Sequence, residues 1–261
     1  MKRIFPLLTC LLFMTMSISA DDISLDELFE NYKASVVIPN ITTTLTVQLI
    51  SAKGEVREIQ ARAYQKAKSE TDASRLFLFE YPPSVRDTGI LINSYTDSDK
   101  NTMWMYLPAV KRVKRIALAT SGGGYFMGSD FSYSDFIPKS RDDFNQEYLG
   151  EVILDGEACY KVKESAKTQE QRQNLKLSYM MNYYRVDDYV MYGRDYYDLA
   201  GELVKEYRVK EAILLGGRYM YPTIIEMKNI QNGHRSVLEM SDISLETIPD
   251  SYFTKRFLEK R

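Results

Sequence analysis

Side chains that could act as nucleophiles or metal ligands are few in this chain of 261 residues. His234 is the only histidine, and it stands in an Asn-Gly-His turn where solvent exposure is the expected state. A Ser–His–Asp or Cys–His arrangement would have to use it, and no serine lies in a nucleophile-elbow pattern. A zinc site needs several histidine or cysteine ligands, and beyond residue 20 the chain offers only His234 and Cys159. The sequence therefore predicts a non-enzyme, with no catalytic residue, metal or cofactor.

Two acidic pairs and one basic cluster carry charge without forming a recognisable site. Asp142-Asp143 and Asp187-Asp188 have the chemistry of an acid–base pair or a calcium site, but neighbouring side chains in strands point apart, which favours solvated turns. Residues 111–115 (Lys-Arg-Val-Lys-Arg) lack the interleaved aromatics of a nucleic-acid site. They fit either a solvated turn or a contact with an acidic partner or lipid head groups. The formal net charge of −2 leaves no basic excess for nucleic acid.

Residues 121–136 form the most unusual segment, Ser-Gly-Gly-Gly-Tyr-Phe-Met-Gly-Ser-Asp-Phe-Ser-Tyr-Ser-Asp-Phe. No Lys-Ser/Thr follows the glycines and no helix start is evident, which disfavours a phosphate-binding P-loop. Two interpretations remain: a flexible surface loop, or a mobile gate in which glycine hinges carry aromatic side chains over the entrance of an apolar cavity. The gate would consist of Gly122, Gly123, Gly124, Phe126, Phe131 and Phe136.

The first twenty residues have the order of a secretory signal peptide. Lys2 and Arg3 precede an apolar run at residues 7–16, and small residues follow up to Ala20. The run is too short to span a bilayer, for which about 20 apolar residues are needed. We expect cleavage after Ala20 and a periplasmic location. Cys10 lies inside the apolar run, which disfavours lipidation there.

The remaining residues, 21–261, are predicted to form one domain dominated by β-strands. Ser24 and Glu27 have the spacing of a capping box, which predicts a helix. After Pro39 the period changes to the alternation of a half-buried strand. Strand-like stretches with turn signals between them follow at residues 44–49, 56–66, 75–81, 88–94, 102–107, 113–119, 146–154, 158–164, 179–187, 189–195, 203–214, 221–229 and 236–245. Such a series without long helices predicts an antiparallel meander, and residues 248–251 signal a closing helix.

Several central strands are apolar on both faces, which a sheet with one solvated face would not be. Either a second layer buries both faces, or a strongly curved sheet encloses an apolar cavity whose mouth the first and last helices plug. A sheet of about ten strands tends to curl, which favours the cavity. The expected fold is thus mainly β (α+β): a curved antiparallel sheet in a half-open barrel covered by a few helices. The predicted cavity lining is Leu45, Val47, Leu49, Phe77, Phe79, Leu91, Trp104 and Tyr106.

Several motifs resemble one known family. They are Phe77-x-Phe79-x-Tyr81-Pro82-Pro83, then Met103-Trp104-Met105-Tyr106-Leu107-Pro108, the Gly-Ser-Asp-Phe-Ser-Tyr-Ser-Asp-Phe run at residues 128–136, and the ending from Ile248 to Arg256. Together they resemble the outer-membrane lipoprotein-sorting proteins, the LolA/LolB-like periplasmic carriers, over most of residues 21–261.

The resemblance implies a half-closed barrel whose apolar interior holds the acyl chains of a lipoprotein. It also implies an inner-membrane transporter that delivers the cargo, an outer-membrane acceptor, and no catalytic residues. We therefore expect a monomeric carrier of lipoprotein or other lipid. The alternative is a non-catalytic envelope scaffold, an adhesive protein or an accessory subunit of a membrane exporter.

Overall fold

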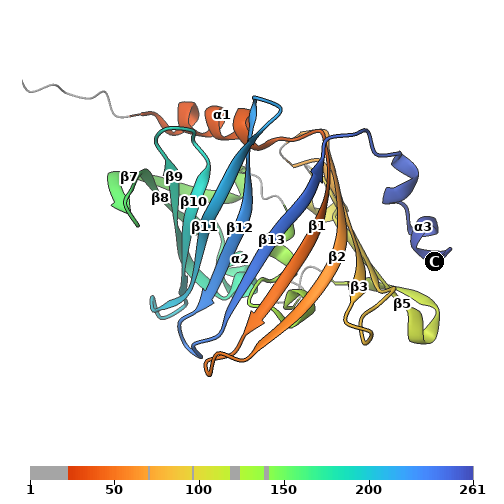
Figure 1. The fold of residues 1–261 in the computed structure, drawn as a ribbon. Coiled ribbons are helices and arrows are strands. Elements are labelled where there is room, and N and C mark those ends of the chain that lie inside the picture. Colours follow the sequence, from red (N-terminus) through yellow and green to blue (C-terminus); the bar gives the residue numbers. More distant parts are fainter. Residues whose placement is uncertain (1–22, 70, 96, 118–123, 138–140, 261) are drawn as a thin grey trace, which may run out of the picture.

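One antiparallel sheet dominates the computed structural model, which describes residues 23–69, 71–95, 97–117, 124–137 and 141–260 (Figure 1). Its strands are β1 (Asn40–Ile50), β2 (Val56–Ala67), β3 (Ala73–Tyr81), β4 (Gly89–Ser94), β5 (Thr102–Leu107), β6 (Arg112–Ile116), β7 (Phe144–Leu154), β8 (Glu157–Ala166), β9 (Leu177–Arg185), β10 (Met191–Asp198), β11 (Leu203–Leu215), β12 (Tyr219–Asn229) and β13 (Arg235–Ser244). The helices are α1 (Leu25–Val36), α2 (Gln169–Leu175) and α3 (Lys255–Glu259). The alternation in the sequence located these strands because each has one face in contact with apolar neighbours.

The strand order is β6-β5-β4-β3-β2-β1-β13-β12-β11-β10-β9-β8-β7. The chain runs from β1 outward to one edge at β6, crosses to the other edge at β7, and returns strand by strand to β13 beside β1. The sheet curves without closing, with β6 and β7 as its edges in the described part of the chain (Figure 1). The predicted curved antiparallel sheet in a half-open barrel is confirmed.

Helix α1 lies across one end of this curve (Figure 1). It begins where the sequence predicts, because the Ser24 side chain accepts a hydrogen bond of 3.1 Å from the backbone N–H of Glu27. Its Leu28 is fully buried against side chains of β8 and β9, including Tyr160 and Tyr184. Helix α1 therefore covers the end of the barrel that we call the mouth.

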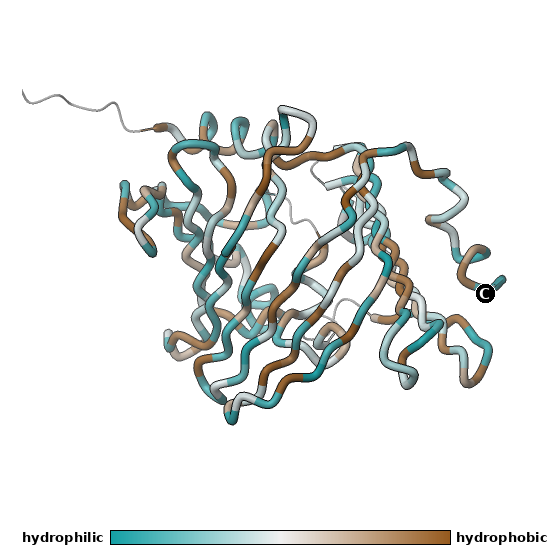
Figure 2. Tube along the Cα trace, in the orientation of Figure 1, coloured by the Kyte–Doolittle hydropathy of each residue, from teal (hydrophilic) through white to brown (hydrophobic). Residues whose placement is uncertain are grey.

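The two faces of the sheet are covered in different ways, which explains why the central strands are apolar on both. Along the long strands, Figure 2 shows brown alternating with teal, as expected where only one face of the strand is buried. Strand β3 differs, because both of its faces carry buried apolar side chains. In β3, Phe77 and Phe79 face the concave interior, whereas Leu76 and Leu78 face outward. The outward side chains pack beneath the C-terminal segment of the chain, through Ile248, Phe253 and Leu258.

The C-terminal segment lies on the outer face, so the expectation that the last helix plugs the mouth is wrong (Figure 1). Lys66 on β2 holds it there by an ion pair of 2.6 Å with Asp250. The ring of Tyr252 meets that of Tyr64 at 5.4 Å, edge to face. The apolar outer surface of β3 to β5 is continuous with this segment, and burying that surface favours this position over the mouth.

Leu258→Ala is expected to destabilise the protein by about 2–5 kcal/mol, because it leaves a cavity under a fully buried side chain. Urea denaturation measures this loss. Leu214→Ala is the matched control: its side chain is 59% exposed, and its effect should stay within about 0.5 kcal/mol. Equal effects of the two substitutions would contradict the packing of α3 on the sheet.

Candidate functional site

The concave interior of the barrel gathers five of the eight residues predicted to line a cavity. Leu45, Val47, Phe77 and Phe79 are buried there, and Leu49 packs against them partly exposed. The strand register brings them together, since Val47 pairs with Ile59 and Phe77 pairs with both Ala63 and Ile90. The result is an apolar surface that runs across the inner side of β1 to β5.

The other three predicted lining residues lie on the opposite face, so that part of the prediction is wrong. Leu91 and Tyr106 are buried beneath the C-terminal segment, and Trp104 packs there beneath the Lys255 ammonium at 5.3 Å. Leu91 pairs with Leu76 in one direction and with Trp104 in the other. Directly paired residues share a face, so Trp104 lies on the same face of the sheet as Leu76 and on the opposite face from Phe77. The inner face of β5 instead carries Met103 and Met105.

Residues 124–137, which we call the interior segment, fill the space over the concave face (Figure 1). Phe126 and Phe131 are 0% and 2% exposed, and Phe136 packs against them partly exposed. The aromatic side chains of the predicted gate, Phe126, Phe131 and Phe136, thus lie in the concave interior, while Gly124 is exposed with a φ of 87°. That these residues open as a gate stays a prediction. Gly122 and Gly123 lie outside the described residues.

Aromatic contacts join the interior segment to the sheet. The Phe126 ring lies 5.1 Å from that of Phe77 and 5.9 Å from that of Phe79, measured between centroids. Phe136 stacks obliquely on Phe126 at 4.4 Å. The fold of the segment itself is compact, because Phe126 donates its backbone N–H to the carbonyl of Phe131 at 2.7 Å. The segment thus presents its rings as one apolar unit.

A polar latch fixes the interior segment to the opposite wall. The backbone N–H of Asp130 donates to Ser236 Oγ at 2.9 Å, and that hydroxyl donates back to the Asp130 carboxylate at 2.8 Å. Lys205 Nζ donates to the Asp130 carbonyl oxygen at 2.7 Å. Asp130 and Ser236 are both buried, so breaking the latch leaves polar groups without partners. Burial lowers the pKa of Lys205, and the nearby carboxylates of Asp135 and Asp130 partly oppose this by favouring the charged form.

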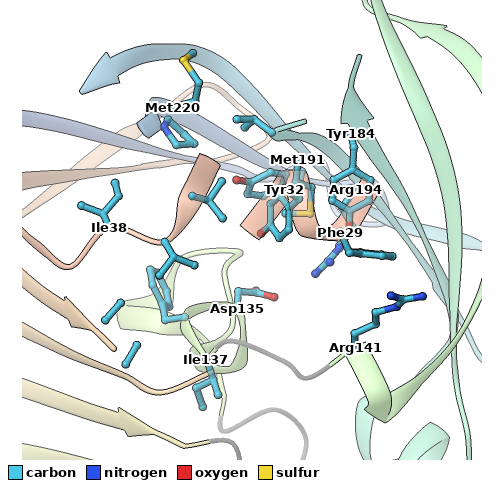
Figure 3. Close-up of a pocket in the computed structure, with 18 of the residues that line it drawn as sticks. Phe29, Tyr32, Ile38, Asp135, Ile137, Arg141, Tyr184, Met191, Arg194 and Met220 are labelled. Carbon is cyan, nitrogen blue, oxygen red and sulfur yellow. The ribbon is translucent and has the colours of Figure 1, made fainter. Parts of the chain in front are cut away.

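A pocket of about 350 Å³ remains at the mouth, between α1 and the interior segment. Figure 3 shows Tyr32 from α1, Asp135 and Ile137 from the interior segment, and Arg194 and Met220 from the strands around it. The lining mixes aromatic and aliphatic side chains with a few charged ones. Such a mixture is typical of a site that orients a ligand by its polar end.

Most charged groups of this pocket already have partners. Arg141 pairs with Asp26 at 2.6 Å, and Arg194 lies 3.6 Å from Glu164 and donates to Asn182. The Asp135 carboxylate accepts hydrogen bonds from Ser132 and from the Tyr196 hydroxyl.

Arg75 differs from these groups. Its Nε donates to Gln65 Oε1 at 2.9 Å, but its Nη1 is buried without a hydrogen-bond partner. Burial lowers the pKa of the guanidinium to about 10, against the opposing influence of the Tyr221 and Tyr32 hydroxyls. The group is still protonated at neutral pH and carries a positive charge into the pocket.

The residues that the sequence singles out for catalytic chemistry lie in separate places within the described part of the chain. His234 is exposed in the turn between β12 and β13, where its backbone N–H donates to Asn232. Asp188 binds Arg185 and caps a turn, Asp142 is exposed, and the basic residues 111–115 lie on the β5–β6 hairpin. Among the described residues, no three His, Cys, Asp or Glu side chains lie close enough to hold a metal ion. No helix in that part of the chain has the length and hydropathy to cross a membrane.

Sequence reasoning missed the polar residues of the mouth and the latch. One signal was present: Arg75 precedes Phe77 and Phe79 at two-residue spacing in the same strand, so a charge stands in line with the buried face. No comparable signal marks Ser236 or Asp130, because their contact joins positions 106 residues apart.

Comparison with known proteins gives the following matches. Residues 71–260 match a family model described as “Uncharacterized protein”, and curated proteins give no significant match. A “putative outer membrane lipoprotein-sorting protein domain” from Vibrio parahaemolyticus is 23% identical, with 90% of this chain and 96% of that chain covered and a TM-score of 0.79. A DUF1329 family protein from Desulfovibrio piger is 24% identical, with 89% and 95% covered and a TM-score of 0.78. A LolA superfamily protein from Nitrosomonas europaea is 18% identical, with 90% and 99% covered and a TM-score of 0.67. These likenesses show that the chain has the LolA-like fold.

Ser236→Ala is expected to loosen the interior segment by about 1–3 kcal/mol, because it leaves the buried Asp130 amide and carboxylate unpaired. Hydrogen exchange of the amides in residues 124–137 should accelerate accordingly. Ser241→Ala, at an exposed position of the same strand, is the control and should leave exchange unchanged. Unchanged protection in the Ser236 variant would mean that the latch does not hold the segment.

The Cys159 thiol is expected to be inert in the folded protein. The side chain is fully buried, and burial together with the charge of Glu157 raises its pKa to about 11. The reactive thiolate is therefore scarce at neutral pH. A thiol reagent added to protein lacking residues 1–20 should label Cys159 in urea and not in buffer; stoichiometric labelling in buffer would contradict this.

Proposed function

The chain belongs to the family whose model its residues 71–260 match, its fold is LolA-like, and on that premise we propose that it is a periplasmic carrier of acyl chains. It would bind a lipoprotein or another lipid in the barrel interior and move it between the inner and outer membranes. The names of two similar structures, a lipoprotein-sorting domain and a LolA superfamily protein, support this class of function.

One observation carries the proposal: the sheet's own side chains do not fill the space that the sheet encloses. Aromatic rings of residues 124–137 occupy this space instead. In the sequence, this segment lies between the edge strands β6 and β7. In a two-layer sandwich the second face would be a sheet with its own ladder of hydrogen bonds. Here the cover is held by side-chain packing and by hydrogen bonds from Ser236 and Lys205, which makes it exchangeable.

Acyl chains and the interior segment would then compete for the same apolar surface. Each CH₂ group removed from water contributes about 0.8 kcal/mol, so a long chain gains enough to displace a few aromatic rings. With no ligand bound, the segment keeps the concave face dry. Release at an acceptor would reverse the exchange, as the segment returns to the interior.

The pocket under α1 is the natural entrance. At about 350 Å³ it lies near the lower end of the range for small-molecule sites, roughly 300–1,000 Å³. A diacyl lipid needs the interior as well. Helix α1 contributes Phe29 and Tyr32 to the lining, so movement of this helix would widen the entrance.

Export is part of the proposal. The signal peptide at residues 1–20 and the cleavage site after Ala20 lie outside the described residues and stay predictions. The inner-membrane transporter and outer-membrane acceptor likewise follow from the resemblance to carriers, as does the absence of enzymatic activity.

Organic extraction of the protein purified from cells should release lipid in about one-to-one ratio, detected by mass spectrometry. An envelope scaffold or exporter subunit with a permanently filled interior would release none. Protein unfolded, washed and refolded before extraction is the control, because it has lost its original ligand. Absence of lipid from the native sample would overturn the carrier function.

The two faces of the sheet should respond differently to a polar substitution. Leu49→Gln places an amide on the concave face and is expected to lower acyl-chain retention several-fold, because the amide loses water when a chain binds. Trp104→Gln, on the outer face, should leave retention unchanged while lowering stability. Titration with a fluorescent fatty acid measures both. A loss of binding in the Trp104 variant alone would place the site beneath the C-terminal segment instead.

A further inference from the structure

We propose that the ligand is an amphiphile with an anionic head group, and that Arg75 binds this head group at the mouth of the barrel. The inference rests on the proposed carrier function and adds the chemical class of the ligand. It is carried by the position of Arg75 and by the state of its guanidinium.

Arg75 stands where the polar mouth meets the apolar interior. It lies near the start of β3 and pairs with Gln65 of β2 and Ile92 of β4. Side chains two apart in a strand share a face, so Arg75, Phe77 and Phe79 follow one another along the concave side. A head group bound at Arg75 therefore directs its chain toward the two phenylalanines.

Within the part of the chain that the structure describes, the Arg75 guanidinium is not paired with an anion. The other two arginines of the pocket, Arg141 and Arg194, pair with Asp26 and Glu164. No carboxylate pairs with Arg75 among the described residues, and its one hydrogen bond, from Nε to Gln65, is to a neutral amide. A buried cation without a counter-ion is unfavourable, and an incoming anion removes that penalty.

Among the described residues, the groups that act directly on the Arg75 guanidinium are neutral ones. Gln65 comes from β2, Tyr221 from β12 on the far wall, and Tyr32 from α1 above. Asp135 also lines the pocket, but Ser132 and Tyr196 already bind its carboxylate. Burial raises the pKa of Tyr221 to about 12. Tyr221 therefore presents an uncharged hydroxyl group to a ligand at neutral pH.

A carboxylate or phosphate fits this place because a guanidinium binds two of its oxygens side by side. A neutral ester or amide head accepts at most weaker hydrogen bonds and leaves the charge uncompensated. The site should therefore select among lipids with identical chains by the charge of their heads. The acyl chains would provide most of the affinity, and Arg75 would provide the selectivity for an anionic head group.

The test compares two lipids that differ only in the head group, dipalmitoyl phosphatidic acid and dipalmitoylglycerol. Delipidated protein is titrated with each, and displacement of a fluorescent apolar probe is measured. Wild-type protein should bind the phosphatidic acid about tenfold more tightly or better. Arg75→Gln should reduce the preference to less than about threefold while keeping the affinity for dipalmitoylglycerol. Arg75→Lys should retain part of the preference.

Arg57→Gln is the matched control, since Arg57 is exposed at the opposite end of β2 and its variant should behave as wild type. Equal binding of the two lipids by wild-type protein, or an undiminished preference in Arg75→Gln, would overturn the inference and leave the carrier function intact. Binding of neither lipid would overturn the carrier function itself. Inorganic phosphate is the third ligand: displacement of the probe by phosphate alone, abolished in Arg75→Gln, would make this an anion site and contradict the amphiphile.

A stability measurement separates a binding role from a structural one. If Arg75 serves the ligand, Arg75→Met removes an unpaired charge, and the ligand-free variant should melt at the wild-type temperature or above it. A structural arginine would give the opposite result, a melting temperature several degrees lower, and would contradict the assignment even if lipid selectivity fell.

Discussion

The apolar concave face of an open, curved sheet must be kept from water, and the rest of this structure depends on how that is done. A closed barrel would exclude water by its own walls, and a sandwich would use a second sheet. This sheet does neither, since β6 and β7 remain apart as edges. The cover comes from residues 124–137, whose rings lie against Phe77 and Phe79. A short segment thus takes the place of a whole layer over the apolar surface.

The topology explains why this segment is available. Strands β1 to β6 and β7 to β13 form two runs that meet where β1 pairs with β13. The chain must therefore cross from one edge of the sheet to the other between β6 and β7. The described part of that crossing lies in the interior and is fastened by Ser236 and Lys205, both near the middle of the sheet. The same stretch of chain thus connects β6 to β7 and covers the concave face of the sheet.

Polarity changes from the mouth to the interior. Arginine, tyrosine and carboxylate side chains surround the pocket under α1, whereas phenylalanine, leucine and methionine side chains line the space beyond. An amphiphile has the same order of polarity along its length. The outer face takes no part in this gradient, because the C-terminal segment seals it against the surface that carries Trp104.

The sequence by itself determined the class of fold, most strand positions and the start of α1. These follow from local physics: a two-residue alternation and a capping serine. Only the tertiary structure decided which apolar side chains share a face across strands. Phe77 and Trp104 belong to different faces because the register through β4 sets Trp104 opposite Leu91, and a shift of one residue would reverse this. It likewise decided that the aromatic segment lies inside and that no carboxylate of the described residues pairs with Arg75, since both depend on contacts between residues far apart in the chain.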